Sequence, residues 1–259
     1  MQQADYEAFK QNVLRKSGID LDLYRQEQMY RRLKGMLERT RLETFDEYFR
    51  LIESDPKEWA AFLDRITINV SELFRNPEKW EQLRDEVLAP WLKQGKQLRV
   101  WSAGCAMGAE PYTLAMILHD LSPGMRHYLL ATDIDEQTLE QAKQGIYTAE
   151  AVKHVPMTYR HKYLRKRGDK YEVSPTLRSA VTFRKHNLLC DPFETNLDLI
   201  VCRNVVIYFT DEAKGRLYTR FRTALAPGGI LFVGGTERIF NYRELGFETR
   251  LPFFYQRAA

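Results

Sequence analysis

The stretch Leu98–Glu110, LRVWSAGCAMGAE, decides which fold we expect. Its first half, Leu98–Ser102, has the composition of a buried β-strand, and the turn Gly104–Gly108 leads into a helix expected from Glu110 to about Leu121. Glycine lets the backbone of such a turn pass close to a ligand, because it has no Cβ to collide with it. A strand, a glycine-containing turn and a helix in this order are typical of the first unit of an α/β sheet.

Strands and helices keep alternating after this unit. A helix is expected to start near Glu136, and the apolar alternation from Phe247 to Tyr255 indicates a pair of edge strands. The other strands are predicted at Tyr128–Asp133, Val181–Lys185, Leu197–Cys202 and Gly229–Gly234. The sequence therefore predicts an α/β domain with a mostly parallel sheet that is covered on both faces.

The N-terminal part of the chain has a helical pattern instead. Asp5 is expected to cap a first helix that ends at Ser17–Gly18. A third helix should start at Thr44 or Asp46, and Pro56 should open a fourth. The second helix carries an apolar stripe made of Met29, Leu33, Met36 and Leu37. These helices predict an all-helical N-terminal domain.

Three segments follow from this pattern. We expect the helical domain over residues 1–75, a linker helix over 76–95, and the α/β domain over 96–259. Residues 150–182 are expected to form a small inserted antiparallel β-subdomain, because the basic segment Tyr159–Val173 ends in an alternating pattern.

Composition excludes several classes of protein. Cys105, Cys190 and Cys202 form no CxxC pair and have no metal-ligand spacing with histidine, so no metal site is expected. No apolar run approaches the ~18–20 residues of a membrane helix, and the first residues do not resemble a secretory signal. We therefore expect a cytoplasmic monomer without membrane insertion. The net charge of +4 does not by itself indicate a nucleic-acid partner.

Two acidic residues near the glycine turn indicate the kind of cofactor. The turn lacks a full GxGxxG, and Glu110 at the helix start would repel the phosphates of a dinucleotide. A cationic ligand would instead be attracted to it, although Glu110 could also be an ordinary first-turn charge. Asp133, at the tip of the second strand, is placed to accept hydrogen bonds from ribose hydroxyls, and Asp135 is expected to cap the next helix.

Five segments together resemble one family, the CheR-type chemotaxis receptor methyltransferases. They are Thr67–Arg75 (TINVSELFR), Ser102–Tyr112 (SAGCAMGAEPY), Ala131–Asp135 (ATDID), Asn187–Leu189 (NLL) and Cys202–Phe209 (CRNVVIYF). The resemblance implies a Rossmann-like class I methyltransferase domain with a small inserted antiparallel β-subdomain, preceded by an all-helical domain that recognises the substrate. It also implies methyl transfer from S-adenosylmethionine to glutamate carboxylates of chemoreceptors, in sensory adaptation, with S-adenosylhomocysteine as the product.

The resemblance also assigns residues to the site. Besides Gly104 of the turn, the cofactor would be held by Asn69, Ser71, Arg75, Glu110, Asp133, Asn187, Leu188, Arg203 and Asn204. Relatives often have threonine where this chain has Ser71, and that exchange keeps the hydroxyl.

Methylation of a glutamate needs no general base, because its carboxylate, with a pKa of about 4.3, is already ionised at neutral pH. Arg75 and Tyr208 suit the task of orienting that carboxylate, and the matching residues of the family act near the reacting centre. The alternatives are that Tyr208 belongs to an apolar core run, Val205–Phe209, and that Arg75 forms a surface salt bridge.

A basic helix is the predicted docking surface for the receptor. Arg31, Arg32, Lys34 and Arg39 avoid its apolar stripe, so they either attract an acidic helix of the receptor or form a solvated face. Relatives that bind a receptor's C-terminal pentapeptide carry a glycine-rich turn where this chain has Arg165–Lys170, RKRGDK. The sequence therefore disfavours a pentapeptide tether, and the basic insertion would contact the receptor body or remain solvated.

Two other functions stay open from the sequence. One is a methyltransferase of RNA or of a small molecule, although no alternation of aromatic and basic residues for base stacking is evident. The other is a protein that binds S-adenosylmethionine as a sensor without turnover, against which the presence of Arg75 and Tyr208 speaks.

Overall fold

A computed structural model describes residues 2–67 and 71–258. The N-terminal domain consists of helices α1 (Gln2–Ser17), α2 (Gln26–Thr40), α3 (Phe45–Ser54) and α4 (Pro56–Thr67), with a short 3₁₀ turn at Leu21–Leu23. The predicted stripe of α2 is buried, and it packs with aromatic side chains of α1, α3 and α4 around Phe9, which is fully buried. The all-helical N-terminal domain is thus confirmed.

Of the two predicted helix caps at Thr44 and Asp5, the first is confirmed and the second is wrong. Thr44 caps α3 through a reciprocal capping box with Glu47, as expected for one of the two candidates. The expectation for Asp5 was wrong, because α1 already begins at Gln2. Instead, the Asp5 carboxylate accepts hydrogen bonds from the Phe45 N–H (2.7 Å) and the Asp46 N–H (3.0 Å). Asp5 therefore caps α3 from a neighbouring helix, since the first amides of α3 have no partner within their own helix.

A broken helix leads to the α/β domain. It comprises α5 (Pro77–Gln82), a π-helical turn η2 (Leu83–Leu88) and α6 (Ala89–Lys93). Pro90 explains the irregularity, because proline has no N–H to donate to the carbonyl four residues earlier, at Glu86. That carbonyl accepts a hydrogen bond from Arg250 Nη2 (2.8 Å) instead.

The main sheet has seven strands in the order β6-β2-β1-β7-β8-β10-β9. The first five strands in this order are parallel to one another. Strand β10 pairs antiparallel with β8, and β9 pairs antiparallel with β10, so the pair of edge strands predicted near the C-terminus is present. In chain order the strands are β1 (Arg99–Ala103), β2 (Tyr128–Asp133), β6 (Val181–Lys185), β7 (Leu197–Cys202), β8 (Leu225–Val233), β9 (Phe247–Leu251) and β10 (Phe254–Arg257).

The central strands are apolar throughout because both of their faces are covered. In β1, Val100 packs into the core beneath α7 (Ala109–Leu121), whereas Trp101 packs into the core beneath α11 (Asp211–Ala224). Side chains that alternate between two cores must all be apolar, which explains the unbroken runs in the sequence. Helix α8 (Glu136–Gln144) follows β2, and Asp135 caps it by accepting from the Gln137 and Thr138 N–H groups, as predicted. The predicted Rossmann-like fold is confirmed.

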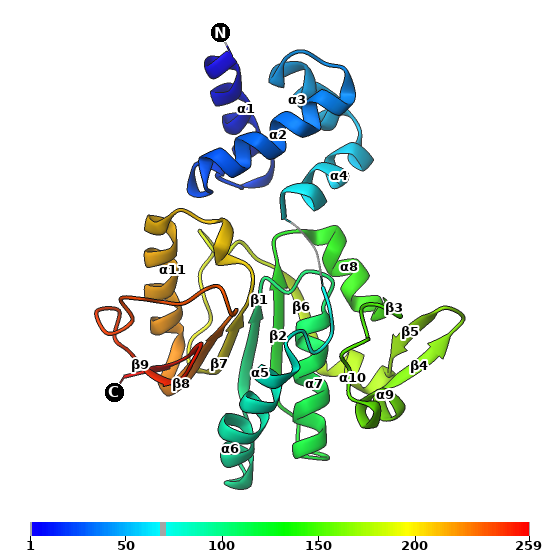
Figure 1. The fold of residues 1–259 in the computed structure, drawn as a ribbon, viewed down its shortest axis with the longest axis vertical. Helices are drawn as coiled ribbons and strands as arrows, with labels where there is room; N and C mark the ends of the chain where they lie inside the picture. The colour runs from blue at the N-terminus through cyan, green and yellow to red at the C-terminus, as the bar shows by residue number, and fades with distance from the viewer. Residues whose placement is uncertain (1, 68–70, 259) are drawn as a thin grey trace.

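A small antiparallel sheet, in the order β3-β5-β4, projects from this domain (Figure 1). It contains β3 (Ile146–Thr148), β4 (Leu164–Arg167) and β5 (Lys170–Val173); helix α9 (Met157–Tyr163) lies between β3 and β4, and α10 (Pro175–Ala180) follows β5. The predicted inserted subdomain is therefore present, and its first strand lies just before residue 150. The basic residues of its hairpin, Arg165, Lys166, Arg167 and Lys170, are exposed.

The helical domain lies over the carboxyl ends of the parallel strands (Figure 1). Among the described residues, the hydrogen bonds that join residues 2–67 to the α/β domain include Arg25 N–H to Tyr208 O (2.9 Å), Thr210 N–H to Leu23 O (2.9 Å) and Asn187 Nδ2 to Gly18 O (3.0 Å). No helix among the described residues is long and apolar enough to cross a membrane.

Candidate cofactor and methyl-transfer site

A cavity of about 370 Å³ lies where the carboxyl ends of β1, β2 and β7 meet the helical domain. Strand order reverses between β1 and β7, and ligands of open α/β sheets bind at this kind of switch point. The cavity is large enough for a small organic cofactor. Of the predicted site residues, Ser71, Arg75, Gly104, Glu110, Asp133, Asn187, Leu188, Arg203, Asn204 and Tyr208 all line it. Asn69, the remaining one, lies outside the described residues.

The glycine turn is held in a shape that only glycine tolerates. Gly104 has a φ of +79°, and a Cβ at this position would lie 2.5 Å from Val205 Cγ2. The turn is fixed from the other side as well, because the N–H groups of Gly104 and Cys105 both donate to the Thr132 carbonyl at 2.9 Å. The first strand, the second strand and the loop after β7 are thereby packed together around the cavity.

Asp133 stands at the tip of β2 and faces the cavity. Its carboxylate accepts hydrogen bonds from the Ala106 N–H (2.8 Å) and the Asp135 N–H (3.1 Å). These amides orient both oxygens, and each oxygen keeps a second lone pair for a ligand hydroxyl. Burial raises the pKa of Asp133 above its usual value, while the backbone amides oppose that shift.

Glu110 supplies a second carboxylate to the cavity. Its Oε1 accepts a hydrogen bond from the Ser102 hydroxyl (2.7 Å). Burial raises the pKa of Glu110 to about 7, and the charge of Arg203 opposes this rise. A carboxyl with such a pKa is half ionised at neutral pH, so a cationic ligand would draw it fully into the charged form.

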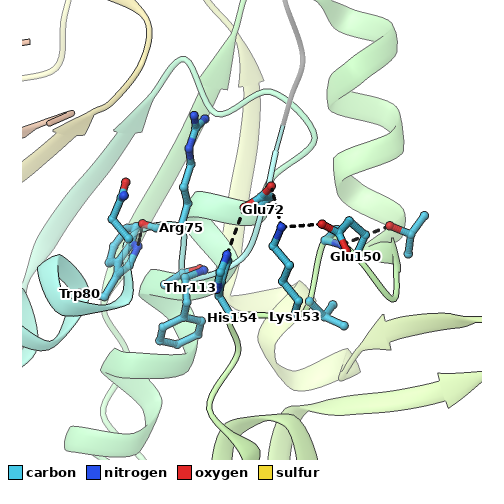
Figure 2. Close-up of polar contacts among 12 residues, drawn as sticks. Glu72, Arg75, Trp80, Thr113, Glu150, Lys153 and His154 are labelled. Carbon is cyan, nitrogen blue, oxygen red and sulfur yellow. Dashed lines mark hydrogen bonds and ion pairs between the residues drawn. The ribbon is translucent and has the colours of Figure 1, made fainter. Parts of the chain in front are cut away.

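Arg75 comes from the segment that joins the two domains (Figure 2). Its carbonyl accepts from Trp80 Nε1 (3.0 Å) and from Arg203 Nη2 (3.1 Å), and the neighbouring Phe74 N–H donates to Thr113 Oγ1 (3.0 Å). In Figure 2 the Arg75 side chain extends away from Thr113, and Arg75 belongs to the lining of the cavity. The backbone is thus anchored on both sides of the residue.

Glu72 was not predicted, yet it also lines the cavity. Its carboxylate lies 3.7 Å from Lys153 Nζ and 3.6 Å from His154 Nε2, on the loop between β3 and α9 of the insertion (Figure 2). Tyr24, Trp80 and His186 are other lining residues that the sequence did not single out. Each is an aromatic or imidazole side chain outside the glycine turn, so no local pattern marked it.

Tyr208 ends a 3₁₀ turn, η3 (Val206–Tyr208), and is not part of an apolar core strand. Its carbonyl accepts from the Arg25 N–H, and the guanidinium of Arg32 lies 5.5 Å from the centre of its ring. Arg32 also donates to the Ile66 carbonyl (2.9 Å). Of the four predicted docking residues, Arg32 therefore contacts the site itself, whereas Arg31, Lys34 and Arg39 are exposed.

No group of three or more His, Cys, Asp or Glu side chains in residues 2–67 and 71–258 could hold a metal ion. Cys105 and Cys202 are buried, and burial raises the pKa of both thiols.

Comparisons with known proteins agree with this geometry. A family model described as CheR methyltransferase, SAM binding domain, matches residues 69–250, and one described as CheR methyltransferase, all-alpha domain, matches residues 4–67. The chain is 42% identical over 253 residues to the chemotaxis protein methyltransferase of Listeria monocytogenes, covering 97% of this chain and 96% of that one. It is 33% identical over 258 residues to the chemotaxis protein methyltransferase of Escherichia coli, covering 95% and 88%.

The cavity fits S-adenosylmethionine, the cofactor named by the matched domain. Gly104 lines the cavity without a side chain, Asp133 offers acceptors for hydroxyls, and Glu110 offers a negative charge to a cation. Both domains of the chain are covered by the two family models. The chain belongs to the CheR methyltransferase family, and it is an S-adenosylmethionine-dependent methyltransferase.

Proposed function

We propose that this enzyme transfers the methyl group of S-adenosylmethionine to glutamate side chains of chemoreceptors, forming methyl esters and S-adenosylhomocysteine in sensory adaptation. One observation carries the proposal: Arg75 and Tyr208 line the same cavity as Glu110 and Asp133. A cation and a phenol next to a cofactor site suit a carboxylate acceptor. The names of the relatives from Listeria and Escherichia coli support the chemotactic role.

The residues around the cavity divide into two groups by chemistry. Asp133 and Glu110, with Ser71, Asn187, Leu188, Arg203, Asn204 and the undescribed Asn69, would hold the cofactor, which when bound supplies a methyl group on a sulfonium. Arg75 and Tyr208 would hold the acceptor carboxylate. Arg75 does so as a charged fork, and Tyr208 as a neutral hydroxyl donor.

Alignment is the main task of these residues. In-line displacement requires that the acceptor oxygen, the methyl carbon and the leaving sulfur lie on one line, and fixing this geometry lowers the barrier. The acceptor is ionised before it binds, so no residue has to remove a proton. Two donors that replace water around the carboxylate fix its orientation while it loses hydration.

The domains and the surface suggest where the receptor binds. We infer that residues 1–75 recognise the substrate, that 76–95 link the domains, and that 96–259 carry out transfer. The exposed Arg31, Lys34 and Arg39 of α2 present positive charge on the domain above the cavity, where an acidic receptor helix would be attracted. The insertion would contact the receptor body, not a C-terminal pentapeptide, and the enzyme would act in the cytoplasm as a monomer.

A chemical assay tests the reaction. The enzyme is incubated with methyl-labelled S-adenosylmethionine and membranes that contain chemoreceptors, and mild base is then added. Release of the label as methanol is expected, because a carboxyl methyl ester is hydrolysed by base. Label that stays attached would indicate methylation of another group, and absence of label from the receptor would contradict the proposal. Parallel incubations with RNA test the competing nucleic-acid substrate.

A further inference from the structure

Glu237 is a buried carboxylate outside the cavity. It follows β8 in the turn Gly234-Gly235-Thr236-Glu237, and only 4% of its surface is exposed. Its Oε2 accepts hydrogen bonds from the Asn204 N–H (2.6 Å) and the Gly234 N–H (2.8 Å), and its Oε1 accepts from the Val206 N–H (2.9 Å). One side chain thus binds backbone amides of two separate loops.

The loop that Glu237 binds is the one that carries the site. It runs from Arg203 to Tyr208, directly after β7, and four of its residues besides Tyr208 line the cavity: Arg203, Asn204, Val205 and Ile207. Asn204 has a φ of +61°, in the left-handed region that asparagine adopts more readily than most residues. The N–H groups of Asn204 and Val206 both donate to the Glu237 carboxylate.

The loop is therefore held from two sides. Val205 packs against Gly104, where no Cβ could fit, and the amides on either side of Val205 bond to Glu237. The Tyr208 carbonyl is fixed separately by Arg25 of the helical domain. Without Glu237, two amides of a tight loop would be buried with no acceptor, and loops relax to avoid this.

The backbone amides favour an ionised carboxylate, because Oε2 accepts two N–H donors and Oε1 accepts one. Burial raises the pKa of Glu237, and these amides oppose that shift. An amide NH₂ group in place of either oxygen would face an N–H donor. Gly234 is fitted to this arrangement, because a Cβ there would lie 2.5 Å from Glu237 Oε2 and 3.0 Å from the Asn204 nitrogen. The negative charge also acts on the site, since it raises the pKa of Arg203 against the lowering caused by burial.

We propose that Glu237 is a positioning residue for methyl transfer: it holds the loop Arg203–Tyr208 so that Asn204 faces the cofactor and Tyr208 faces the acceptor carboxylate. This assignment rests on the proposed function for the role of Tyr208. The holding of the loop itself depends only on the contacts of Glu237.

The test compares Glu237→Gln with Glu47→Gln. Glu47 is the control, because its carboxylate also accepts backbone amides, those of Glu43 and Thr44, in an exposed helix cap that does not line the cavity. Hydrogen exchange should become about tenfold or more faster at residues 204–206 in Glu237→Gln and stay unchanged there in Glu47→Gln. The Kd of S-adenosylhomocysteine, measured by calorimetry, should rise several-fold only in Glu237→Gln.

Transfer kinetics then show whether the loop acts through Tyr208. Glu237→Gln should lower kcat for receptor methylation by about 10- to 100-fold in the wild-type background. When Tyr208→Phe is already present, adding Glu237→Gln should lower kcat by less than about threefold, because both residues act on the same step. A purely structural role would give equal losses in both backgrounds, and that result would overturn the assignment.

A second variant keeps the test decisive if Glu237→Gln does not fold. Gly234→Ala keeps the Glu237 carboxylate, but the added methyl group displaces that carboxylate from the Asn204 N–H. This variant should therefore show the same faster exchange and the same lower kcat as Glu237→Gln. Unchanged exchange at 204–206, or unchanged kcat despite faster exchange, in the folded variant would refute the proposal. If the wild-type enzyme itself methylates no receptor, the proposed function fails, while exchange and S-adenosylhomocysteine binding still decide whether Glu237 holds a cofactor loop.

Discussion

Arg75 and Tyr208 are more than a hundred positions apart in the sequence, and they reach one cavity from different directions. The Arg75 backbone is fixed by Trp80 and Arg203, whereas the Tyr208 backbone is fixed by Arg25 of the helical domain. At the scale of single residues, the proposed function assigns these two side chains to the acceptor carboxylate and Glu110 to the cofactor.

Tyr208→Phe tests the first requirement. Loss of the hydroxyl removes one donor to the acceptor carboxylate, so kcat should fall by about 10- to 100-fold. The Kd of S-adenosylmethionine should change less than twofold, because the proposed role of Tyr208 is to bind the acceptor carboxylate and not the cofactor. Tyr242→Phe, on a tyrosine that does not line the cavity, serves as control. Equal activity of Tyr208→Phe and wild type would remove its hydroxyl from the mechanism.

Glu110 makes cofactor binding depend on pH. Burial raises its pKa to about 7, so in the free enzyme the carboxyl is largely protonated at pH 6 and largely ionised at pH 8. A cationic cofactor binds the ionised form better, hence its affinity should increase as pH rises through 7 and level off above it. Calorimetry should show this rise, of up to about tenfold per pH unit below 7, in wild type. A Glu110→Gln variant should bind more weakly without the rise, and an equal pH dependence in both proteins would exclude Glu110 as the cause.

At the scale of elements, the basic residues of α2 divide into one that packs against the site and three that are exposed. Arg32 is partly buried, and it connects α2 to the end of α4 and to the ring of Tyr208. Arg31, Lys34 and Arg39 remain exposed on the same helix. The sequence could not separate Arg32 from the others, because its partners Ile66 and Tyr208 are distant in the chain.

The exposed charges of α2 should govern receptor affinity. In Arg31→Gln/Arg39→Gln, KM for the receptor should rise about threefold to tenfold with kcat nearly unchanged, and the effect should shrink as salt screens the charges. Arg50→Gln, on α3, is a control because Arg50 is exposed but paired with Asp46. A KM that is insensitive both to these substitutions and to salt would mean that α2 is only a solvated face.

Asp5 gives a second test at this scale, of stability and not of activity. Its carboxylate caps α3 from α1, so Asp5→Ala should lower the free energy of unfolding by about 1–2 kcal/mol. Denaturant unfolding with Asp46→Ala as comparison measures the difference, because Asp46 lies in the same first turn of α3 but pairs only with the exposed Arg50, and its loss should cost less than about 0.5 kcal/mol. Equal small effects would show that the Asp5 bonds do not stabilise α3.

At the scale of the whole molecule, the sequence predicted what depends on local pattern. The central strands were found because burial on both faces makes them continuously apolar, and the glycine turn was found because only glycine suits it. The three-residue strand β3 is too short to show a period, and it forms only because β5 pairs with it. Glu237 escaped notice for a similar reason, since its partners Asn204 and Val206 lie in another loop.

The two domains meet at the cavity, so residues of both domains form the site. The helical domain contributes Tyr24 to its lining and an amide to Tyr208, and the α/β domain contributes the glycine turn and both carboxylates. Arg32 of α2 lies beside the Tyr208 ring, so we expect a receptor helix that reaches this end of the cavity to pass beside α2. The central claim is that the group methylated there is a glutamate carboxylate.

Mass spectrometry of receptor peptides tests that claim most directly. After incubation with S-adenosylmethionine and wild-type enzyme, we predict that peptides from the receptor's cytoplasmic helices gain the mass of one methylene on glutamate side chains, and that mild base reverses the gain. The Arg75→Ala/Tyr208→Phe double variant should leave the same peptides unmodified. A methyl group found on any other side chain, or found equally with the double variant, would contradict the account.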